Sequence, residues 1–203
     1  MSYSGGEHFN KLAKSRGYRS RAAFKLHQIN NKFNLLKKGC SVMDLGSSPG
    51  GWSQVAKELV GNSGKVFALD IIPMKPINGV EFIEFDFRDK DIKKFINLDF
   101  NVVISDIAPN ISGIAITDKE NMLELLNNVV DFCNSSLMKG GSLIAKCFEN
   151  SKNDLKRSLL NHFSNVTFYK PDASRKTSKE IYVIAQNKFC LLYTSDAADD
   201  GSR

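Results

Sequence analysis

The sequence has few residues of the kinds that build metal sites, disulfide frameworks or catalytic histidine clusters. It contains four cysteines and three histidines, and the cysteines show neither CxxC nor Cys/His ligand spacing. Zinc ligation and a disulfide framework are therefore poorly supported, and a reducing compartment fits this cysteine usage. We expect no metal ion in the site.

Long apolar runs are also missing. No stretch approaches the roughly 20 apolar residues that a transmembrane helix needs. Residues 1–9 lack the apolar core of a signal peptide, and the basic residues that follow lie too close to the predicted fold for an organelle presequence. We therefore expect no membrane association and no secretion, and the location stays open between the cytoplasm and the mitochondrion.

The remaining composition is that of one globular domain. The 203 residues are 42% hydrophobic and 25% charged, which is enough for a single core. We expect a mobile N-terminal segment at 1–15, one domain at 16–189, and a non-native tail at 190–203, where the pattern ends abruptly in acidic residues. A monomer is expected. The net charge of +6 fits either a polyanionic partner or solubility alone.

Apolar stretches alternate with segments of helical periodicity along the domain. The expected helices cover 20–29 with Ser20 as N-cap, 51–59, a short helix through Phe95, 119–137 ended by Gly140-Gly141, and 152–162. The expected strands cover 41–45, 65–70, 80–84, 101–106, 142–146, 164–169 and 180–185. This order predicts an α/β fold, a mostly parallel sheet with helices on both faces. Ligands bind such sheets outside the carboxyl ends of the strands.

One loop between a strand and a helix has the composition of a ligand cradle. The loop Gly46-Ser47-Ser48-Pro49-Gly50-Gly51 follows Asp44 and precedes Trp52. It matches neither GxGxxG nor a Walker loop, so a pyrophosphate ligand is not favoured. Glycine permits close backbone approach, and the amide groups of the new helix face the ligand.

Acidic residues at the ends of the next strands indicate which class of ligand the loop binds. Asp70 ends the second strand, where an acid contacts ribose hydroxyls in dinucleotide-binding folds, and Asp86 follows the third strand, where it can meet an adenine amino group. These residues suit a ligand that contains a ribose, lacks a pyrophosphate and carries cationic groups. S-adenosylmethionine has these features. Trp52 either lines the pocket or belongs to the core. The predicted cofactor-binding residues are Asp44, Gly46, Ser48, Pro49, Gly50, Gly51, Trp52, Asp70, Asp86 and Asp106.

Several motifs in the same order resemble one known family. They are Arg19-Ser20-Arg21-Ala22-Ala23-Phe24-Lys25-Leu26, the loop from Asp44 to Gln54, Ser105-Asp106-Ile107-Ala108-Pro109-Asn110, Gly140-Gly141-Ser142-Leu143-Ile144-Ala145-Lys146 and Lys170-Pro171-Asp172-Ala173-Ser174-Arg175. From about Ser15 to Lys188 the chain resembles the FtsJ (RrmJ) family of ribose 2′-O-methyltransferases. The loop sequence is more similar to that of the bacterial and mitochondrial enzymes that modify large-subunit ribosomal RNA than to that of the tRNA branch, which has Cys-Ala-Ala-Pro-Gly-Ser-Trp there.

The resemblance implies a fold and a reaction. The fold is a Rossmann-like S-adenosylmethionine-dependent methyltransferase sheet of seven strands, the last inserted antiparallel. The reaction is 2′-O-methylation of a ribose, expected in a uridine of large-subunit ribosomal RNA. The family's Lys-Asp-Lys-Glu tetrad matches Lys25, Asp106, Lys146 and Glu180. Lys146 would act as general base in its neutral form, with Lys25, Asp106 and Glu180 setting its charge and orientation.

The expected partner is RNA, because DNA lacks the reacting 2′-hydroxyl. The substrate is either free ribosomal RNA or the assembled large ribosomal subunit. Basic residues would grip phosphates around the mouth of the site. They are Lys11, Lys14, Arg16, Arg19, Arg21, Lys37, Lys38, Arg175, Lys176 and Lys179.

Three other functions stay open at this stage. The first is 2′-O-methylation of tRNA or of an mRNA cap. The second is a non-catalytic RNA-binding scaffold, which the filled tetrad disfavours. The third is an NAD-dependent oxidoreductase, which the loop spacing and the second lysine disfavour.

Overall fold

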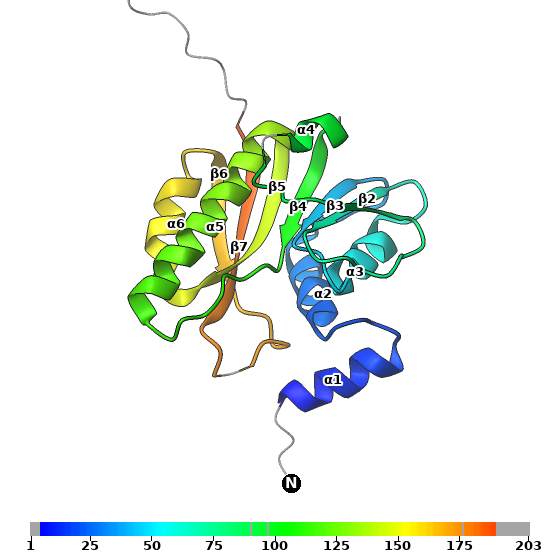
Figure 1. Cartoon of the computed structure of the whole chain (residues 1–203), viewed down its shortest axis with the longest axis horizontal. Coiled ribbons are helices and arrows are strands. Elements are labelled where there is room, and N and C mark those ends of the chain that lie inside the picture. Colours follow the sequence, from blue (N-terminus) through cyan, green and yellow to red (C-terminus); the bar gives the residue numbers. More distant parts are fainter. Residues whose placement is uncertain (1–4, 90, 97, 176, 190–203) are drawn as a thin grey trace, which may run out of the picture.

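Strands and helices alternate through most of the chain in the computed structural model, which describes residues 5–89, 91–96, 98–175 and 177–189 (Figure 1). The helices are α1 Gly5–Ser15, α2 Ala22–Phe33, α3 Gly51–Val60, α4 Ile92–Phe95, α5 Ala115–Ser136 and α6 Lys152–Leu159, with a 3-10 turn at Glu149–Ser151. The strands are β1 Ser41–Leu45, β2 Lys65–Asp70, β3 Val80–Glu84, β4 Phe100–Ser105, β5 Leu137–Phe148, β6 Phe163–Tyr169 and β7 Glu180–Lys188.

The strands form one sheet in the order β3-β2-β1-β4-β5-β7-β6. All neighbouring pairs up to β5 are parallel, while β7 lies between β5 and β6 and is antiparallel to both. The predicted Rossmann-like methyltransferase fold, including the antiparallel insertion of the last strand, is confirmed. The central strands β1 and β4 are therefore neighbours, and the loops that follow them open at the same edge of the sheet.

Each face of the sheet carries its own hydrophobic core. Successive side chains of a strand point to opposite faces, so Val103 joins the core under α5 and α6 whereas Val102 and Ile104 join the core under α2 and α3. Figure 1 shows α5 and α6 together on one side of the sheet and α2 and α3 on the other. The two layers hold the strand ends in a rigid frame.

The N-terminal part of the chain differs from the sequence expectation. The sequence indicates no element in residues 1–15, but Gly5–Ser15 forms α1, whose Phe9 ring lies 5.4 Å from the Phe24 ring of α2. Ala13 is buried in the same contact. The helix expected over 20–29 also has other bounds: α2 begins at Ala22, after Arg21 in the N-cap position, and ends at Phe33, and Ser20 does not cap it. The mobility of 1–15 stays a prediction, and residues 1–4 lie outside the described ranges.

The start of β5 is also different. Gly140-Gly141 does not end the preceding helix, which stops at Ser136; both glycines lie within β5. The pairing of β4 with β5 shifts register between Phe100 and Val102, and Gly140 has a φ of 77°. The glycines therefore belong to an irregular strand entry, where a left-handed residue is needed. The predicted tail 190–203 lies outside the described residues.

Within the described ranges, no helix combines the length and apolar character needed to cross a bilayer. Nor does that part of the chain hold a group of three or more His, Cys, Asp or Glu side chains placed to bind a metal ion.

Candidate active site

The pairing of three strands brings the predicted catalytic residues together. Ser105 of β4 pairs with Ala145 of β5, so the residues that follow them, Asp106 and Lys146, lie side by side. On the other flank β7 pairs with β5 in the opposite direction and places Tyr182 beside Lys146 and Glu180 beside Phe148. The sheet register, rather than any loop, sets the spacing of these side chains.

Lys146 is the centre of the charge network. Its Nζ donates to the main-chain oxygen of Asp106 at 2.6 Å and lies 3.1 Å from Asp106 Oδ1 and 4.0 Å from Glu180 Oε1. Lys146 is only 8% exposed, so water contributes little to its solvation. A buried amine with three oxygen atoms around it is well placed to hold or accept a proton.

Lys25 enters the same network from α2. Its Nζ lies 3.6 Å from Glu180 Oε2, so the two oxygens of Glu180 bridge the two lysines. Burial opposes ionisation of Glu180, but Lys146 and Lys25 outweigh it and hold the pKa of this carboxyl below its usual value. The four predicted catalytic residues therefore form one connected cluster.

Tyr182 belongs to the cluster although the sequence argument did not include it. Its hydroxyl donates to Asp106 Oδ1 at 2.6 Å, and Lys25 Nζ lies 5.5 Å from the centre of its ring. Burial, with Asp106 and Glu180 nearby, raises the Tyr182 pKa well above its usual value, so the hydroxyl keeps its proton and stays a donor. Its position two residues after Glu180 in a strand, hence on the same face, was the available signal.

A cavity of about 410 Å³ opens at the segment that directly follows Asp106, which itself is not a lining residue, and its size suits a small-molecule cofactor. Of the predicted cofactor residues, Gly46, Asp70 and Asp86 line it. The other lining residues, which the sequence argument did not name, come from the segments after β2, β3 and β4 and from α5: Leu69, Ile71, Phe85, Phe87, Arg88, Ile107, Ala108, Pro109, Asn110, Asn121, Glu124, Leu125 and Asn128.

The two aspartates that line the cavity already have protein partners. Asp70 Oδ2 accepts from the Ser48 amide at 2.8 Å, and Asp70 Oδ1 accepts from the Ile72 amide at 2.9 Å. Asp86 is paired with Arg88, whose Nη2 donates to Oδ2 at 2.6 Å, and this hydrogen bond holds the pKa of Asp86 below its usual value. Each carboxylate oxygen can accept further hydrogen bonds from a ligand.

Asp44 lies beneath the loop and does not line the cavity. It is 1% exposed and accepts a hydrogen bond from Ser53 Oγ at 2.5 Å, which ties the end of β1 to the first turn of α3. Burial raises its pKa to about 7, with the nearby carboxylates Asp106 and Asp70 adding to the effect. The geometry supports a structural part for Asp44, while direct contact with a ligand stays a prediction.

The rest of the predicted loop lies outside the cavity lining. Ser48, Pro49, Gly50 and Gly51 form the turn into α3, where Ser48 contributes its amide to Asp70. Trp52 is buried, donates to the main-chain oxygen of Ala22 at 2.8 Å and packs against Tyr182 with ring centres 5.5 Å apart. Of the two interpretations of Trp52, the structure favours the core.

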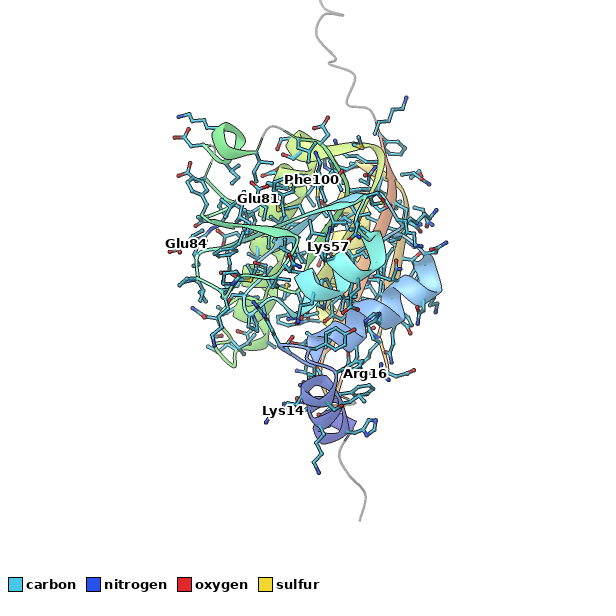
Figure 2. The ribbon with its side chains drawn as sticks, turned by 90° about the vertical axis from the view of Figure 1, so that its right-hand side faces the viewer. Lys14, Arg16, Lys57, Glu81, Glu84 and Phe100 are labelled. Atoms are coloured by element: carbon cyan, nitrogen blue, oxygen red, sulfur yellow. The ribbon has the colours of Figure 1, made fainter. Side chains whose placement is uncertain are left out.

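The predicted RNA-binding residues divide into separate groups. Lys14 and Arg16 are exposed at the α1 end of the molecule, as Figure 2 shows, whereas Glu81 and Glu84 lie on the edge strand β3. Arg175 and Lys179 are exposed in the segment before Glu180. In Figure 1 this segment and α2 lie along the same lower side of the view. Lys176 lies outside the described residues.

Four other predicted contacts are less favourably placed. Lys37 and Lys38 are exposed but precede β1, so they lie at the opposite end of that strand from Gly46. Arg19 donates to three main-chain oxygens, those of Pro49, Lys75 and Pro76. Arg21 is half-buried, and its Nη1 is buried without a hydrogen-bond partner in the described part of the chain. RNA binding by each of these residues stays a prediction.

Comparisons with known proteins agree with this geometry. A family model described as FtsJ-like methyltransferase matches residues 18–188. The Ribosomal RNA large subunit methyltransferase E of Neisseria meningitidis (strain FAM18) is 43% identical over 188 residues, which cover 90% of this chain and 91% of that protein. The protein of the same name from Psychrobacter sp. (strain PRwf-1) is 45% identical over 185 residues, 88% of each chain.

A solved structure is similar over most of its length. A Plasmodium falciparum chain described as a ribosomal RNA methyltransferase superposes with a TM-score of 0.76 at 31% identity, covering 85% of this chain and 99% of that chain.

Proposed function

Because this chain belongs to the FtsJ-like methyltransferases, we propose that it methylates the 2′-hydroxyl of a ribose in large-subunit ribosomal RNA, with S-adenosylmethionine as the cofactor. We further propose that the target is a uridine. The observation that carries the proposal is the buried Lys146 amine, held within 3.1 Å of Asp106 at the strand end beside the cavity.

The cavity fits this cofactor by its chemistry. It offers carboxylates for a ribose and an amino group, apolar walls for a base, and one basic side chain, Arg88, that is already paired with Asp86. A phosphate-bearing ligand would lack a free cationic partner among these lining residues. Asp70 would hold the ribose and Asp86 the adenine. When bound, S-adenosylmethionine supplies a methyl group on an electrophilic sulfonium sulfur.

Lys146 would act as the general base for the ribose hydroxyl. A hydroxyl is a weak nucleophile until its proton is drawn away, and a positioned base contributes about 10²–10⁴ in rate. As neutral Lys146 accepts that proton, positive charge develops on Nζ. Asp106 and Glu180, whose oxygens lie 3.1 Å and 4.0 Å away, stabilise that charge without having to move.

Lys25 and Tyr182 would orient the two carboxylates. Lys25 Nζ lies 3.6 Å from Glu180 and the Tyr182 hydroxyl lies 2.6 Å from Asp106, so each carboxylate has a second partner besides Lys146. A carboxylate with a fixed partner keeps its oxygen directed at the base. These two residues therefore act through Asp106 and Glu180.

The large ribosomal subunit is the proposed substrate because relatives that match about nine-tenths of the chain carry that substrate in their names. The exposed basic residues Arg16, Arg175 and Lys179 would contact RNA phosphates, so binding should weaken as salt rises. The reaction would take place wherever these subunits are found, in the cytoplasm or in a mitochondrion.

A substrate panel tests the proposal. The full chain is incubated with methyl-labelled S-adenosylmethionine and, in separate reactions, with large ribosomal subunits lacking the modification, naked large-subunit RNA, tRNA, capped mRNA and DNA of matched sequence. We expect incorporation into the subunit or its RNA and none into DNA. Incorporation into tRNA or capped mRNA alone would overturn the ribosomal assignment and leave the chemistry in place.

A further inference from the structure

The segment Gly17–Ser20, which we name the strap, connects α1 to α2. It lies against the outside of the cofactor loop, the loop Gly46–Gly51 after β1. Its main chain is fixed to α3 by Gln54, whose Nε2 donates to the Gly17 oxygen at 3.0 Å and whose Oε1 accepts from the Arg19 amide at 2.9 Å. Tyr18 adds a hydrogen bond from its hydroxyl to Glu58 Oε2 at 2.7 Å. The strap is therefore held in place along α3 by three hydrogen bonds.

Arg19 extends from the strap to two separate loops. Its Nη1 donates to the main-chain oxygens of Pro49 at 3.1 Å and of Lys75 at 2.5 Å, and its Nη2 donates to the oxygen of Pro76 at 2.7 Å. Pro49 belongs to the loop after β1, and Lys75 and Pro76 belong to the segment after β2. One guanidinium thus joins the two loops that form one wall of the cavity.

Two glycines of the cofactor loop make room for this arrangement. A Cβ atom at Gly50 would lie 2.7 Å from Ile77 Cδ1 and 3.1 Å from Arg19 Nη1, and the φ of Gly50 is 105°. A Cβ at Gly51 would collide with the hydroxyl of Ser20. These glycines, which the sequence argument assigned to close approach by a ligand, are required here by the strap and by the segment after β2.

The same two loops are joined a second time from the inside. Asp70, at the end of β2, accepts the amides of Ser48 and Ile72, so it links the loop after β1 to the segment that follows β2. Gly46 and Ile71, which line the cavity, lie on these two loops, and Asp70, which also lines it, is the last residue of β2. The spacing of this wall is therefore set by Asp70 on the inner side and by Arg19 on the outer side.

We propose that Arg19 is a positioning residue that holds the cofactor-binding loops together, and that it is not a phosphate contact of the RNA. This inference rests on the proposed function, because it takes S-adenosylmethionine as the ligand of the cavity. Three of the five N–H donors of the guanidinium, both on Nη1 and one on Nη2, are given to main-chain oxygens of the two loops, which leaves Arg19 only two donors for an RNA phosphate. Arg16, three residues earlier and exposed, has no such commitment to the loops and makes a matched comparison.

The test measures two affinities separately in the full-length protein. Calorimetry with S-adenosylmethionine alone gives the cofactor Kd, and titration of labelled large-subunit RNA at several salt concentrations gives the RNA Kd and its salt slope. The variants are Arg19→Ala, Arg19→Lys and Arg16→Ala. Thermal melting shows whether each variant folds. If Arg19→Ala does not fold, the comparison uses Arg19→Lys, which keeps the positive charge but loses the planar set of guanidinium donors.

We expect Arg19→Ala to weaken cofactor binding about tenfold or more, because three hydrogen bonds from a charged donor are lost. RNA affinity and salt slope should change less than about twofold, since no phosphate contact is lost. Arg19→Lys should recover part of the cofactor affinity. Arg16→Ala should do the reverse, lowering RNA affinity and the salt slope with cofactor binding unchanged.

The outcomes separate this inference from the proposed function. If the wild-type protein and Arg19→Ala bind the cofactor equally while Arg19→Ala loses RNA affinity as Arg16→Ala does, the positioning role is wrong and the proposed function stands. If the wild-type protein does not bind S-adenosylmethionine, both the proposed function and this inference are wrong.

Discussion

The catalytic cluster and the cofactor cavity share one edge of the sheet, yet they are built in different ways. Lys146, Asp106 and Glu180 come from strands or strand ends, and their side chains are satisfied by one another and by Lys25 and Tyr182. One wall of the cavity comes from the loops after β1 and β2, which Asp70 and Arg19 tie together. Changes in the cluster should therefore alter the chemical step, and changes in the wall should alter cofactor affinity.

The largest effect should come from Lys146→Ala. Loss of the base should lower kcat by about 10²–10⁴, the usual scale for a positioned general base. Cofactor affinity should change little, because Lys146 does not line the cavity. Single-turnover methylation and calorimetry measure the two quantities, with exposed Lys152→Ala as control. Turnover near the wild-type rate in Lys146→Ala would remove this residue from the mechanism.

Asp70→Asn should show the opposite pattern. Its carboxylate accepts two amides, and an asparagine can accept well from only one of them while its own NH₂ group faces the other. We expect cofactor Kd to rise about ten- to a hundredfold, the value of one to two charged hydrogen bonds. At saturating cofactor, kcat should stay within a few-fold of wild type. A large fall in kcat with unchanged Kd would show that the two regions are not separable.

Tyr182→Phe should have a smaller effect on the cluster. It removes the donor 2.6 Å from Asp106 and leaves the ring that packs on Trp52 and faces Lys25. We expect kcat to fall roughly tenfold, as for the loss of one hydrogen bond to a charged group. Steady-state assays at saturating cofactor test this, and calorimetry should show an unchanged cofactor Kd. An unchanged kcat would mean that Asp106 is oriented without Tyr182.

Asp44 connects the two regions, because both Asp106 and Asp70 add to the effect of burial in raising its pKa to about 7. The folded protein therefore keeps the Asp44 proton up to about pH 7, whereas an unfolded aspartic acid loses it near pH ~4. Unfolding between these values releases a proton, so this group's contribution to stability is present at low pH and is lost as pH rises towards 7. The slope is at most about 1.4 kcal/mol per pH unit.

Asp44→Asn should remove that slope. Urea titrations at pH 4.5 to 8 give the difference in unfolding free energy between wild type and variant. This difference contains the contribution of Asp44 and cancels that of groups whose pKa values shift in the opposite direction, such as Glu180. A difference that does not vary with pH would show that Asp44 titrates normally in the folded protein.

Features that depend on local pattern were accessible from the sequence. Hydrophobic runs ending in Asp70, Asp106 and Lys146 predict parallel strands whose carboxyl ends meet, and that convergence is what the structure shows. The position of Glu180 beside Lys25 came from the family resemblance, because nothing local in the sequence relates a helix start to the beginning of β7.

Features that depend on distant packing were not accessible. Arg19 was expected at RNA because an exposed basic segment and a loop clamp have the same composition, and only the fold shows that the oxygens of Pro49 and Lys75 lie within its reach. Helix α1 was missed although Phe9, Leu12 and Ala13 have the i, i+3, i+4 spacing of one helix face. What the sequence does not show is that this face packs on Phe24 of α2. The placement of Lys37 and Lys38, by contrast, could be predicted from the sequence, because they precede β1 and the site lies at its carboxyl end.

The position of the methyl group in the product tests the central claim most directly. Large ribosomal subunits lacking the modification are incubated with labelled S-adenosylmethionine and either wild type or Lys146→Ala, and the RNA is then hydrolysed with alkali, which leaves the linkage after a 2′-O-methylated nucleotide intact. We predict one labelled alkali-resistant dinucleotide, carrying a uridine, with the wild type and almost none with Lys146→Ala. Label on a base, or equal label from both proteins, would contradict the account.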